Sequence, residues 1–384
     1  MRDSRRLVIG ALMGVIGLAV TAAHAASPAD PAKPGPFPVG VTRTLLIDHR
    51  RTDALTEKPR TLVTEIWYPA VDETRSRTKA RFTGFLPVPI DASVEAALQK
   101  VYKQPVAQLD ERYTCDSVRD APVRDGRYSL IVFSHGNGGN RHQNTFWCDH
   151  LASHGYIIVS ADHTGNCSFC IIDGVVIPYA KEQRKQSTED RPKDMSFLLD
   201  QMIRWDRGAD SRFAGKIDTD HAAATGMSFG AFTSVQVIEQ DPRFKAIIPM
   251  SGAWARSHTN TTTPALLMLG IEDRTIGELG NGAIRKYHGE NTGPSYLLEF
   301  ILGGHYTFTD MFKINPKFGD GVGQGQRADG ASFDYTSMER SYEIVNAYST
   351  AFCGLYLKGE TGYQGYLAKN HWKDEVKWDA RGVK

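Results

Sequence analysis

The sequence has 384 residues, of which 41% are hydrophobic and 23% are charged. These proportions are those of a globular protein and exclude a disordered, collagenous or coiled-coil chain. Its 45 basic residues nearly balance its 44 acidic residues, which gives a net charge of +1. No long-range field draws such a chain onto nucleic acid or an anionic membrane, so we expect no nucleic-acid partner and only local recognition.

The first 25 residues have the pattern of an export signal. Three arginines precede an apolar run over residues 7–20, and the tripeptide AHA at 23–25 matches a small-x-small cleavage site. A membrane anchor is the alternative, but the run is short for a bilayer span and a proline-rich linker follows it over residues 26–38. We predict a signal peptide over residues 1–25, a periplasmic or secreted product, and no transmembrane segment in the mature chain. The start SRRLVI also resembles a twin-arginine signal.

The remaining residues, 39–384, are predicted to form a single domain of the α/β class. Apolar runs rich in β-branched residues alternate with stretches of helical periodicity, which is typical of a mainly parallel central sheet with helices on both faces. We expect two opening strands that pair antiparallel at an edge of the sheet, followed by six buried strands. Their ranges are 40–49 and 61–68, then 129–133, 156–161, 222–226, 246–250, 265–269 and 296–302.

Two helices stand out between and after these strands. Met195, Leu198 and Met202 lie on one face of a helix that is predicted to begin near Pro192. A second helix is predicted over residues 341–358. The segments 70–126 and 318–333 fit no regular element, and long loops of this kind are often lids or binding walls.

Five cysteines lie beyond the signal sequence, and an exported protein meets an oxidising compartment. Cys167 and Cys170 have CxxC spacing, for which a zinc or redox site is one interpretation. No second CxxC pair accompanies them, so a structural role or a local disulfide is favoured and we predict no metal. We expect one bridge, between Cys167 and Cys170 or else between Cys115 and Cys148.

The segment GMSFG at residues 226–230 is a G-x-S-x-G motif. It directly follows a predicted strand and opens the predicted helix 231–240. A turn this tight needs glycines on both flanks, and it presents Ser228 at the carboxyl edge of the sheet. This context predicts that Ser228 is a catalytic nucleophile.

A serine nucleophile needs a base to take its proton and an acid to orient that base. Asp273 follows the strand 265–269 by a short turn, and His305 follows the last strand within LGGHY, which gives the order Ser, Asp, His. Asp273 and His305 are therefore the predicted acid and base. Glu272 is the alternative acid.

Two backbone N–H groups are needed where negative charge develops on the substrate oxygen. One is expected from Phe229, the residue after the nucleophile. The other is expected from Asn137, in the segment SHGNGG after the strand 129–133. His135 in the same segment is predicted to buttress this loop rather than to act as a base.

Seven segments together resemble the secreted platelet-activating-factor acetylhydrolases and the bacterial dienelactone-hydrolase-like group of α/β-hydrolases, over about residues 37–358. They are FPVGVTRTLLIDHRR, TEIWYPA, FSHGNGG, LASHGYIIVSADH, RPKDMSFLLD, GMSFG and GGHYTFTD. The resemblance implies the same roles for Ser228, Asp273, His305 and Asn137. Dienelactone hydrolases carry cysteine at the nucleophile, whereas this chain has serine; Ala231 replaces a common glycine, and the stretch from Phe318 has no counterpart.

These features predict an exported serine esterase that acts through an acyl-enzyme on small-molecule or lipid esters, without metal or organic cofactor. The resemblance implies short-acyl phospholipids as candidate substrates, besides other short-acyl esters. Trp254, Tyr306 and Phe308 are candidate substrate contacts, with core packing as the alternative for each, and Phe229 is expected to close the acyl pocket. A polyester or lipid hydrolase with a larger groove, an acyltransferase and a non-catalytic binding protein stay open as alternatives.

Overall fold

A computed structural model describes residues 28–383 except for 87–89, 210–211, 254–261 and 328–329. Among these residues, ten strands form one sheet in the order β14-β11-β10-β9-β8-β4-β5-β2-β1-β3. The strands of this sheet are β1 (Val39–Thr52), β2 (Pro59–Pro69), β3 (Ser117–Arg119), β4 (Tyr128–Ser134), β5 (Tyr156–Ala161), β8 (Ile217–Met227), β9 (Phe244–Met250), β10 (Ala265–Gly270), β11 (Ser295–Phe300) and β14 (Val376–Arg381).

The centre of the sheet is parallel, from β5 through β4, β8, β9 and β10 to β11. The strands β1 and β2 pair antiparallel, as predicted, and β2 joins the centre by an antiparallel pairing with β5. They are not the edge, because the short β3 pairs with the outer side of β1. At the other edge β14, which the sequence did not predict, pairs antiparallel with β11.

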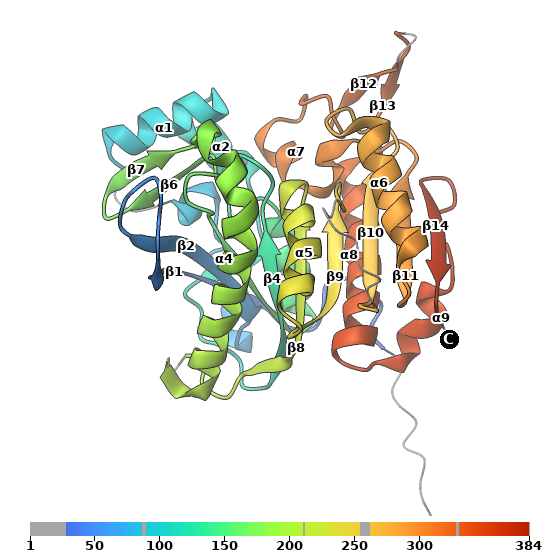
Figure 1. The fold of residues 1–384 in the computed structure, drawn as a ribbon, viewed down its shortest axis with the longest axis horizontal. Helices are drawn as coiled ribbons and strands as arrows, with labels where there is room; N and C mark the ends of the chain where they lie inside the picture. The colour runs from blue at the N-terminus through green and yellow to red at the C-terminus, as the bar shows by residue number, and fades with distance from the viewer. Residues whose placement is uncertain (1–27, 87–89, 210–211, 254–261, 328–329, 384) are drawn as a thin grey trace, which may run out of the picture.

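Helices cover both faces of the sheet (Figure 1). Successive residues of β4 point to opposite faces: Ile131 and Phe133 enter the core under α3 (Thr145–Ser153) and α8 (Met338–Leu357), while Leu130 and Val132 enter the other core. That second core lies under α4 (Arg184–Arg204), α5 (Phe229–Gln240) and α6 (Gly277–Glu290), which lie in front of the strands in Figure 1. The predicted α/β architecture is confirmed.

Several predicted boundaries were wrong. The helix expected from Pro192 begins a full two turns earlier, so α4 contains Pro192 in its interior. The segment 70–126 is not one long loop, since it holds β3, α1 (Ala92–Tyr102) and α2 (Val106–Arg112). The stretch 318–333 contains most of a small hairpin of β12 (Gln324–Gln326) and β13 (Ser332–Asp334), which stands out from the body of the molecule above α6 in Figure 1. The short helix α7 (Met311–Ile314) precedes this hairpin in the chain.

The remaining elements are short. The strands β6 (Phe169–Ile172) and β7 (Val175–Pro178) form a hairpin beside α1, and α9 (Gln364–Leu367) follows α8. No helix in the described part of the chain is both long and apolar enough to span a bilayer.

The predicted disulfide is wrong, since all five cysteines are free thiols. Cys167 and Cys170 are both buried, the first just before β6 and the second within it. A hydrogen bond that the Cys167 thiol donates to the Cys170 side chain, together with burial, raises the pKa of the Cys167 thiol, so this thiol stays protonated at neutral pH. The pair therefore packs as two small apolar side chains.

Two predictions concern residues outside the described ranges. The signal peptide over residues 1–25 lies there, and so does Trp254. Of the predicted linker 26–38, the part from residue 28 onward is described, and Phe37 packs edge-on against Tyr128 of β4 with ring centroids 6.3 Å apart.

Candidate active site

Ser228 lies between β8 and α5, as its motif predicts. Its backbone has φ 54° and ψ −114°, a left-handed conformation that is uncommon for any residue other than glycine. Gly230 makes this turn possible, because a Cβ atom at that position would overlap the carbonyl oxygen of Ser134 at the end of β4. The turn thus presses against the neighbouring strand and leaves the serine at the carboxyl edge of the sheet.

His305 stands between a hydroxyl and a carboxylate. Its Nε2 atom lies 2.9 Å from Oγ of Ser228, and its Nδ1 atom lies 2.7 Å from Oδ2 of Asp273. The three residues follow β8, β10 and β11, whose carboxyl ends meet at one edge of the parallel sheet. The structure therefore brings together the three side chains that the sequence selected.

Asp273 is 4% exposed and held on both of its carboxylate oxygens. Oδ1 accepts hydrogen bonds of 2.9 Å from the backbone N–H groups of Thr275 and Ile276, which leaves Oδ2 for the imidazole. Two backbone donors fix the direction of the carboxylate, so Asp273 can orient a single imidazole tautomer. The neighbouring Glu272 does not take this position.

Asn137 lies on the loop that follows β4. Its side-chain oxygen accepts a hydrogen bond of 3.0 Å from Nδ2 of Asn166, and its side chain also contacts the Tyr179 hydroxyl. Among the described residues, no hydrogen bond takes up the backbone N–H groups of Asn137 or Phe229. Neither amide therefore has a hydrogen-bond partner within the described part of the protein, as the sequence-based prediction of oxyanion donors requires.

His135 is fully buried behind this loop. Its Nδ1 atom lies 2.6 Å from the Gly136 carbonyl oxygen, and its Nε2 atom accepts a hydrogen bond of 3.1 Å from the backbone of His163. Burial and the charge of Arg191 hold the pKa of His135 well below its usual range. A neutral imidazole with these contacts supports the loop, which is the role that the sequence predicts for it.

A cavity of about 560 Å³ opens beside Ser228 and His305. Its walls come from the loop after β4, from the end of α1 and the loop to α2, and from the segment after His305. The polar residues of these walls include Lys103, Gln104, Arg112, Asn140 and Gln143, and the apolar ones include Val101, Met227, Met311, Ile314 and Phe318. Parts of both segments that the sequence left without regular structure, 70–126 and 318–333, thus line the site.

The aromatic residues predicted to contact substrate separate into two groups. Tyr306 lines the cavity. Phe308 does not, because it is fully buried and packs edge-on against Phe300 with ring centroids 5.6 Å apart. The expectation that Phe229 closes the acyl pocket was also wrong: its ring lies against the Arg191 guanidinium, 4.6 Å from the guanidinium carbon, and does not line the cavity.

Sequence reasoning missed two charged residues that hold the segments carrying the site, Arg191 behind the loop after β4 and Asp320 beside His305. A signal for the first was present, because Arg191 lies four residues before Met195 and thus on the apolar face of α4, where a charged residue is rarely placed without a specific partner. Asp320 lies in a glycine-rich stretch whose pairing no local pattern gives.

The model of the PET hydrolase-like family matches residues 81–315, which is more than half of the chain. The chain belongs to this family. The match includes the segments that carry Asn137, Ser228, Asp273 and His305.

Several named proteins share parts of the sequence of this PET hydrolase-like chain. The platelet-activating factor acetylhydrolase of Cavia porcellus is 26% identical over 34% of this chain, and that of Canis lupus familiaris is 29% identical over 35% of it. These alignments span 36% and 37% of the two relatives, or little more than a third of their length. Cutinase 1 of Thermobifida cellulosilytica is 22% identical over 73% of this chain and 89% of its own. The resemblance to the acetylhydrolases is confirmed.

A solved structure supports the fold. The ferulic acid esterase from Streptomyces cinnamoneus superimposes with a TM-score of 0.66 and 23% sequence identity, over 87% of this chain and 93% of its own. Together with the sheet order and the helices on both faces, this likeness identifies an α/β-hydrolase fold.

Proposed function

We propose that this PET hydrolase-like chain is a serine esterase, which hydrolyses short-acyl carboxylic esters through an acyl-enzyme. The observation that carries the proposal is the position of His305, 2.9 Å from the Ser228 hydroxyl and 2.7 Å from the Asp273 carboxylate. A serine becomes a strong nucleophile only with such an oriented base. The names of the relatives, which include acetylhydrolase and esterase, support the same reaction class.

In the proposed first step, Oγ of Ser228 attacks the ester carbonyl carbon while Nε2 of His305 takes the hydroxyl proton. The carbonyl oxygen becomes an oxyanion that accepts hydrogen bonds from the backbone N–H groups of Asn137 and Phe229. The bond from the carbonyl carbon to the alcohol oxygen then breaks. His305 gives its proton to the departing alcohol, and the acyl group stays on Ser228.

In the second step, water attacks the acyl-enzyme and His305 takes a proton from the water. The bond to Oγ breaks, the proton returns to Ser228, and the carboxylic acid leaves. Asp273 stabilises the imidazolium that forms in each half of the cycle. No group beyond the side chains, the two amides and water takes part.

The cavity supports short acyl chains over long ones. Its volume of about 560 Å³ lies within the range of small-molecule sites. A buried methylene contributes about 0.8 kcal/mol only where it meets an apolar wall. Here amide and charged groups from Gln104, Arg112, Asn140 and Gln143 interrupt the apolar surface. We therefore propose esters with acetyl to butyryl groups, including short-acyl phospholipids, as the favoured substrates.

A fluorophosphonate labelling experiment tests the reaction. Ester hydrolysis and covalent labelling at Ser228 are expected in the wild type, and both are expected to be lost in Ser228→Ala. Ser234→Ala is the matched control, because this serine lies on α5, where its hydroxyl donates to the Ala231 carbonyl oxygen at 2.7 Å, and it does not line the cavity. Labelling of another serine, or hydrolysis that survives in Ser228→Ala, would refute the proposal.

A substrate series tests the acyl preference. We expect kcat/KM to fall from butyryl to palmitoyl esters of one soluble alcohol, because each added methylene gains little from a polar wall. Polyester oligomers and phospholipids belong in the same series, since the family is PET hydrolase-like. A value of kcat/KM that keeps rising beyond about eight carbons would overturn the short-acyl proposal and leave the esterase proposal intact.

Export of the chain rests on its first 25 residues and stays a prediction. The start of the mature protein, measured by N-terminal sequencing after expression with the full leader, is expected near Ala25 or Ala26. A mature chain that still begins at Met1 would refute the signal peptide.

A further inference from the structure

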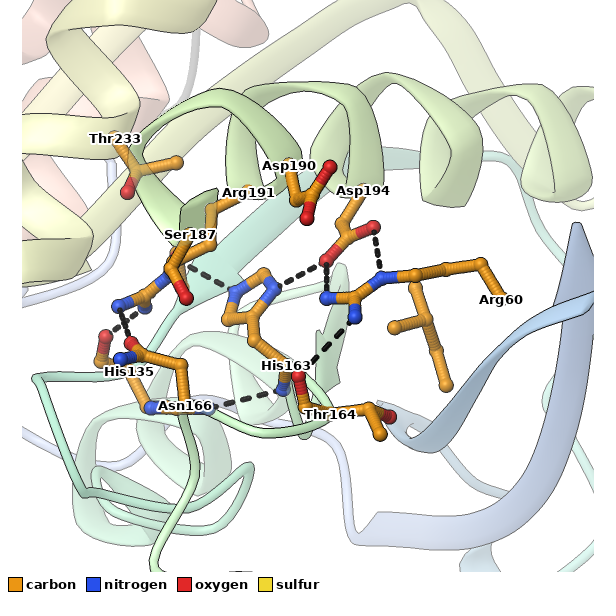
Figure 2. A network of polar contacts seen from close by, with 12 residues as sticks. Arg60, His135, His163, Thr164, Asn166, Ser187, Asp190, Arg191, Asp194 and Thr233 are labelled. Carbon is orange, nitrogen blue, oxygen red and sulfur yellow. Dashed lines mark hydrogen bonds and ion pairs between the residues drawn. The ribbon is translucent and has the colours of Figure 1, made fainter. Parts of the chain in front are cut away.

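A charged side chain lies fully buried behind the loop that follows β4. Arg191 of α4 has no exposed surface. Its guanidinium donates a hydrogen bond of 2.8 Å to the Ser134 hydroxyl and one of 2.9 Å to Oδ1 of Asn166, and it also donates to the His135 carbonyl oxygen. Figure 2 shows this group between α4 and the loop. One guanidinium on α4 therefore joins the end of β4, at Ser134 and His135, to Asn166, which lies about thirty residues further along the chain.

The contact with Asn166 leads to the first predicted oxyanion amide. Nδ2 of Asn166 donates to Oδ1 of Asn137 at 3.0 Å, while the Asn166 carbonyl oxygen accepts from the Gly138 backbone at 2.9 Å. Asn166 thus holds both the Asn137 side chain and the N–H group of the next residue, Gly138. Because Arg191 fixes Asn166 and also binds the His135 carbonyl, it constrains the loop from two directions.

The same guanidinium also contacts the ring of Phe229, the residue that carries the second predicted amide. The guanidinium carbon of Arg191 lies 4.6 Å from the centroid of the Phe229 ring, which is the geometry of a cation–π contact. Phe229 directly follows Ser228. A contact that holds the Phe229 ring therefore also limits how its backbone N–H can turn beside the predicted nucleophile.

We propose that Arg191 is a positioning residue that sets the separation and direction of the Asn137 and Phe229 amides. The inference rests on the proposed function, in which these amides bind the oxyanion. A planar guanidinium suits the task, because it offers several N–H donors in a rigid fork and a flat face for an aromatic ring. Lysine offers a single point charge and lacks this fork.

The surroundings of Arg191 supply the negative charge that keeps a buried guanidinium protonated. Asp194 lies one turn along α4 and binds both Arg60 and His163. Burial alone would raise the pKa of Asp194, but the charge of Arg60 and the hydrogen bond from His163 hold it well below its usual range. Burial lowers the pKa of Arg191 to about 9, while Asp194 raises it, so the guanidinium is charged at neutral pH.

His163 connects the two charged groups without carrying charge itself. Its Nδ1 atom lies 2.9 Å from Oδ2 of Asp194 (Figure 2). Its Nε2 atom lies 2.9 Å from the Ser134 hydroxyl. Burial and the charge of Arg191 lower its pKa to about 3. The Ser134 hydroxyl is thus held between His163 and Arg191, and the end of β4 is tied to α4 at the point where the loop begins.

The test compares Arg191→Met with Arg60→Met. Arg60 is a matched control, because it is also buried, at 5% exposed, and forms an ion pair with Asp194 in the same network, yet no contact links it to Asn166 or Phe229. Both variants are expected to lose thermal stability. Only Arg191→Met is expected to lose kcat per titrated active site, on the order of 10²-fold as for the loss of one oxyanion donor, with KM changed only a few-fold.

A second readout separates positioning from general damage. A boronic acid forms a tetrahedral adduct with the serine, whereas the carboxylic acid product binds without one. We expect Arg191→Met to weaken binding of the boronic acid in step with kcat/KM and to leave binding of the product nearly unchanged. Arg191→Lys is expected to resemble Arg191→Met rather than the wild type.

Asn166→Leu keeps the inference testable if Arg191→Met fails to fold. This change removes the link to Asn137 and leaves Arg191 against Phe229. We therefore expect kcat to fall about tenfold, with weaker binding of the boronic acid and nearly unchanged binding of the carboxylic acid product. Unchanged kcat in a folded Arg191→Met or Asn166→Leu variant, or an equal loss in Arg60→Met, would overturn the inference. A wild type without esterase activity would instead overturn the proposed function itself.

Discussion

The backbone N–H of His305 donates a hydrogen bond of 2.9 Å to Oδ1 of Asp320. The same oxygen accepts the backbone N–H of Arg274 at 3.2 Å, and the other oxygen accepts the Thr275 hydroxyl at 2.8 Å. Arg274 and Thr275 directly follow Asp273. A single carboxylate therefore ties the loop that carries the imidazole to the turn that carries its partner.

We predict that Asp320→Ala lowers kcat, because the two segments lose their shared acceptor and the distance between Asp273 and His305 is no longer fixed. A misplacement of about 1 Å costs on the order of 10²-fold in rate. Asp320→Asn is the control and is expected to stay near the wild type, since its amide oxygen still accepts the two backbone N–H groups. Steady-state kinetics per titrated site distinguish the two, and equal kcat in both would contradict the assignment.

Substitutions of the two acidic residues after β10 are expected to have very different effects on kcat. Asp273→Asn leaves an amide opposite Nδ1 of His305 and favours the wrong tautomer, which costs about 10⁴-fold in kcat in the Ser-His-Asp enzyme for which this change is described. Glu272→Gln is expected to change kcat less than about threefold, because Glu272 does not contact the imidazole. A Glu272→Gln variant as impaired as Asp273→Asn would reverse the choice of acid.

Two glycine substitutions are expected to change stability in opposite directions. Gly230→Ala places a methyl group on the Ser134 carbonyl oxygen and is predicted to cost about 3 kcal/mol or more of folding free energy. Gly282→Ala, within α6, meets no atom within 4 Å and is predicted to stabilise by about 0.5–1 kcal/mol. Denaturant unfolding measures both. A Gly230→Ala protein as stable as the wild type would show that the close approach of Gly230 to the Ser134 carbonyl oxygen does not constrain the turn.

Asp149 is predicted to make stability depend on pH. Burial and the charge of Asp116 raise its pKa to about 7, while it is about 3.8 in the unfolded chain. Between these values the folded state keeps a proton that the unfolded state has released, so the free energy of unfolding falls as pH rises from about 4 to about 7.

Asp149→Asn removes this contribution. Between pH 5 and pH 8 the wild type is expected to lose about 2 kcal/mol more stability than the variant, and the variant is expected to be the more stable protein at pH 8. Because the comparison is a difference between two proteins, the titration of other groups largely cancels. Urea unfolding at both pH values checks it, and parallel pH profiles would contradict it.

The buried strands along the chain and the identity of the three central side chains could be predicted from the sequence. Each of Ser228, Asp273 and His305 follows an apolar run by a few residues, and parallel strands bring their carboxyl ends to one edge. A local sequence pattern is sufficient to predict such residues, because the parallel sheet brings the ends of their strands together. The same reasoning fails for β14, whose six residues VKWDAR alternate with charged groups and pair only because β11 leaves an open edge.

By itself, the sequence determined the α/β class, the serine motif and the placement of Ser228, Asp273 and His305 after three strands, since all of these depend on short-range pattern. Only the tertiary structure decided what surrounds them. Arg191 and Asp320 reach the site through hydrogen bonds between segments that are distant in the chain, and the Phe229 ring turns toward Arg191 instead of the cavity. Such contacts depend on how helices and loops pack against the sheet edge, and no periodicity in the residues specifies them.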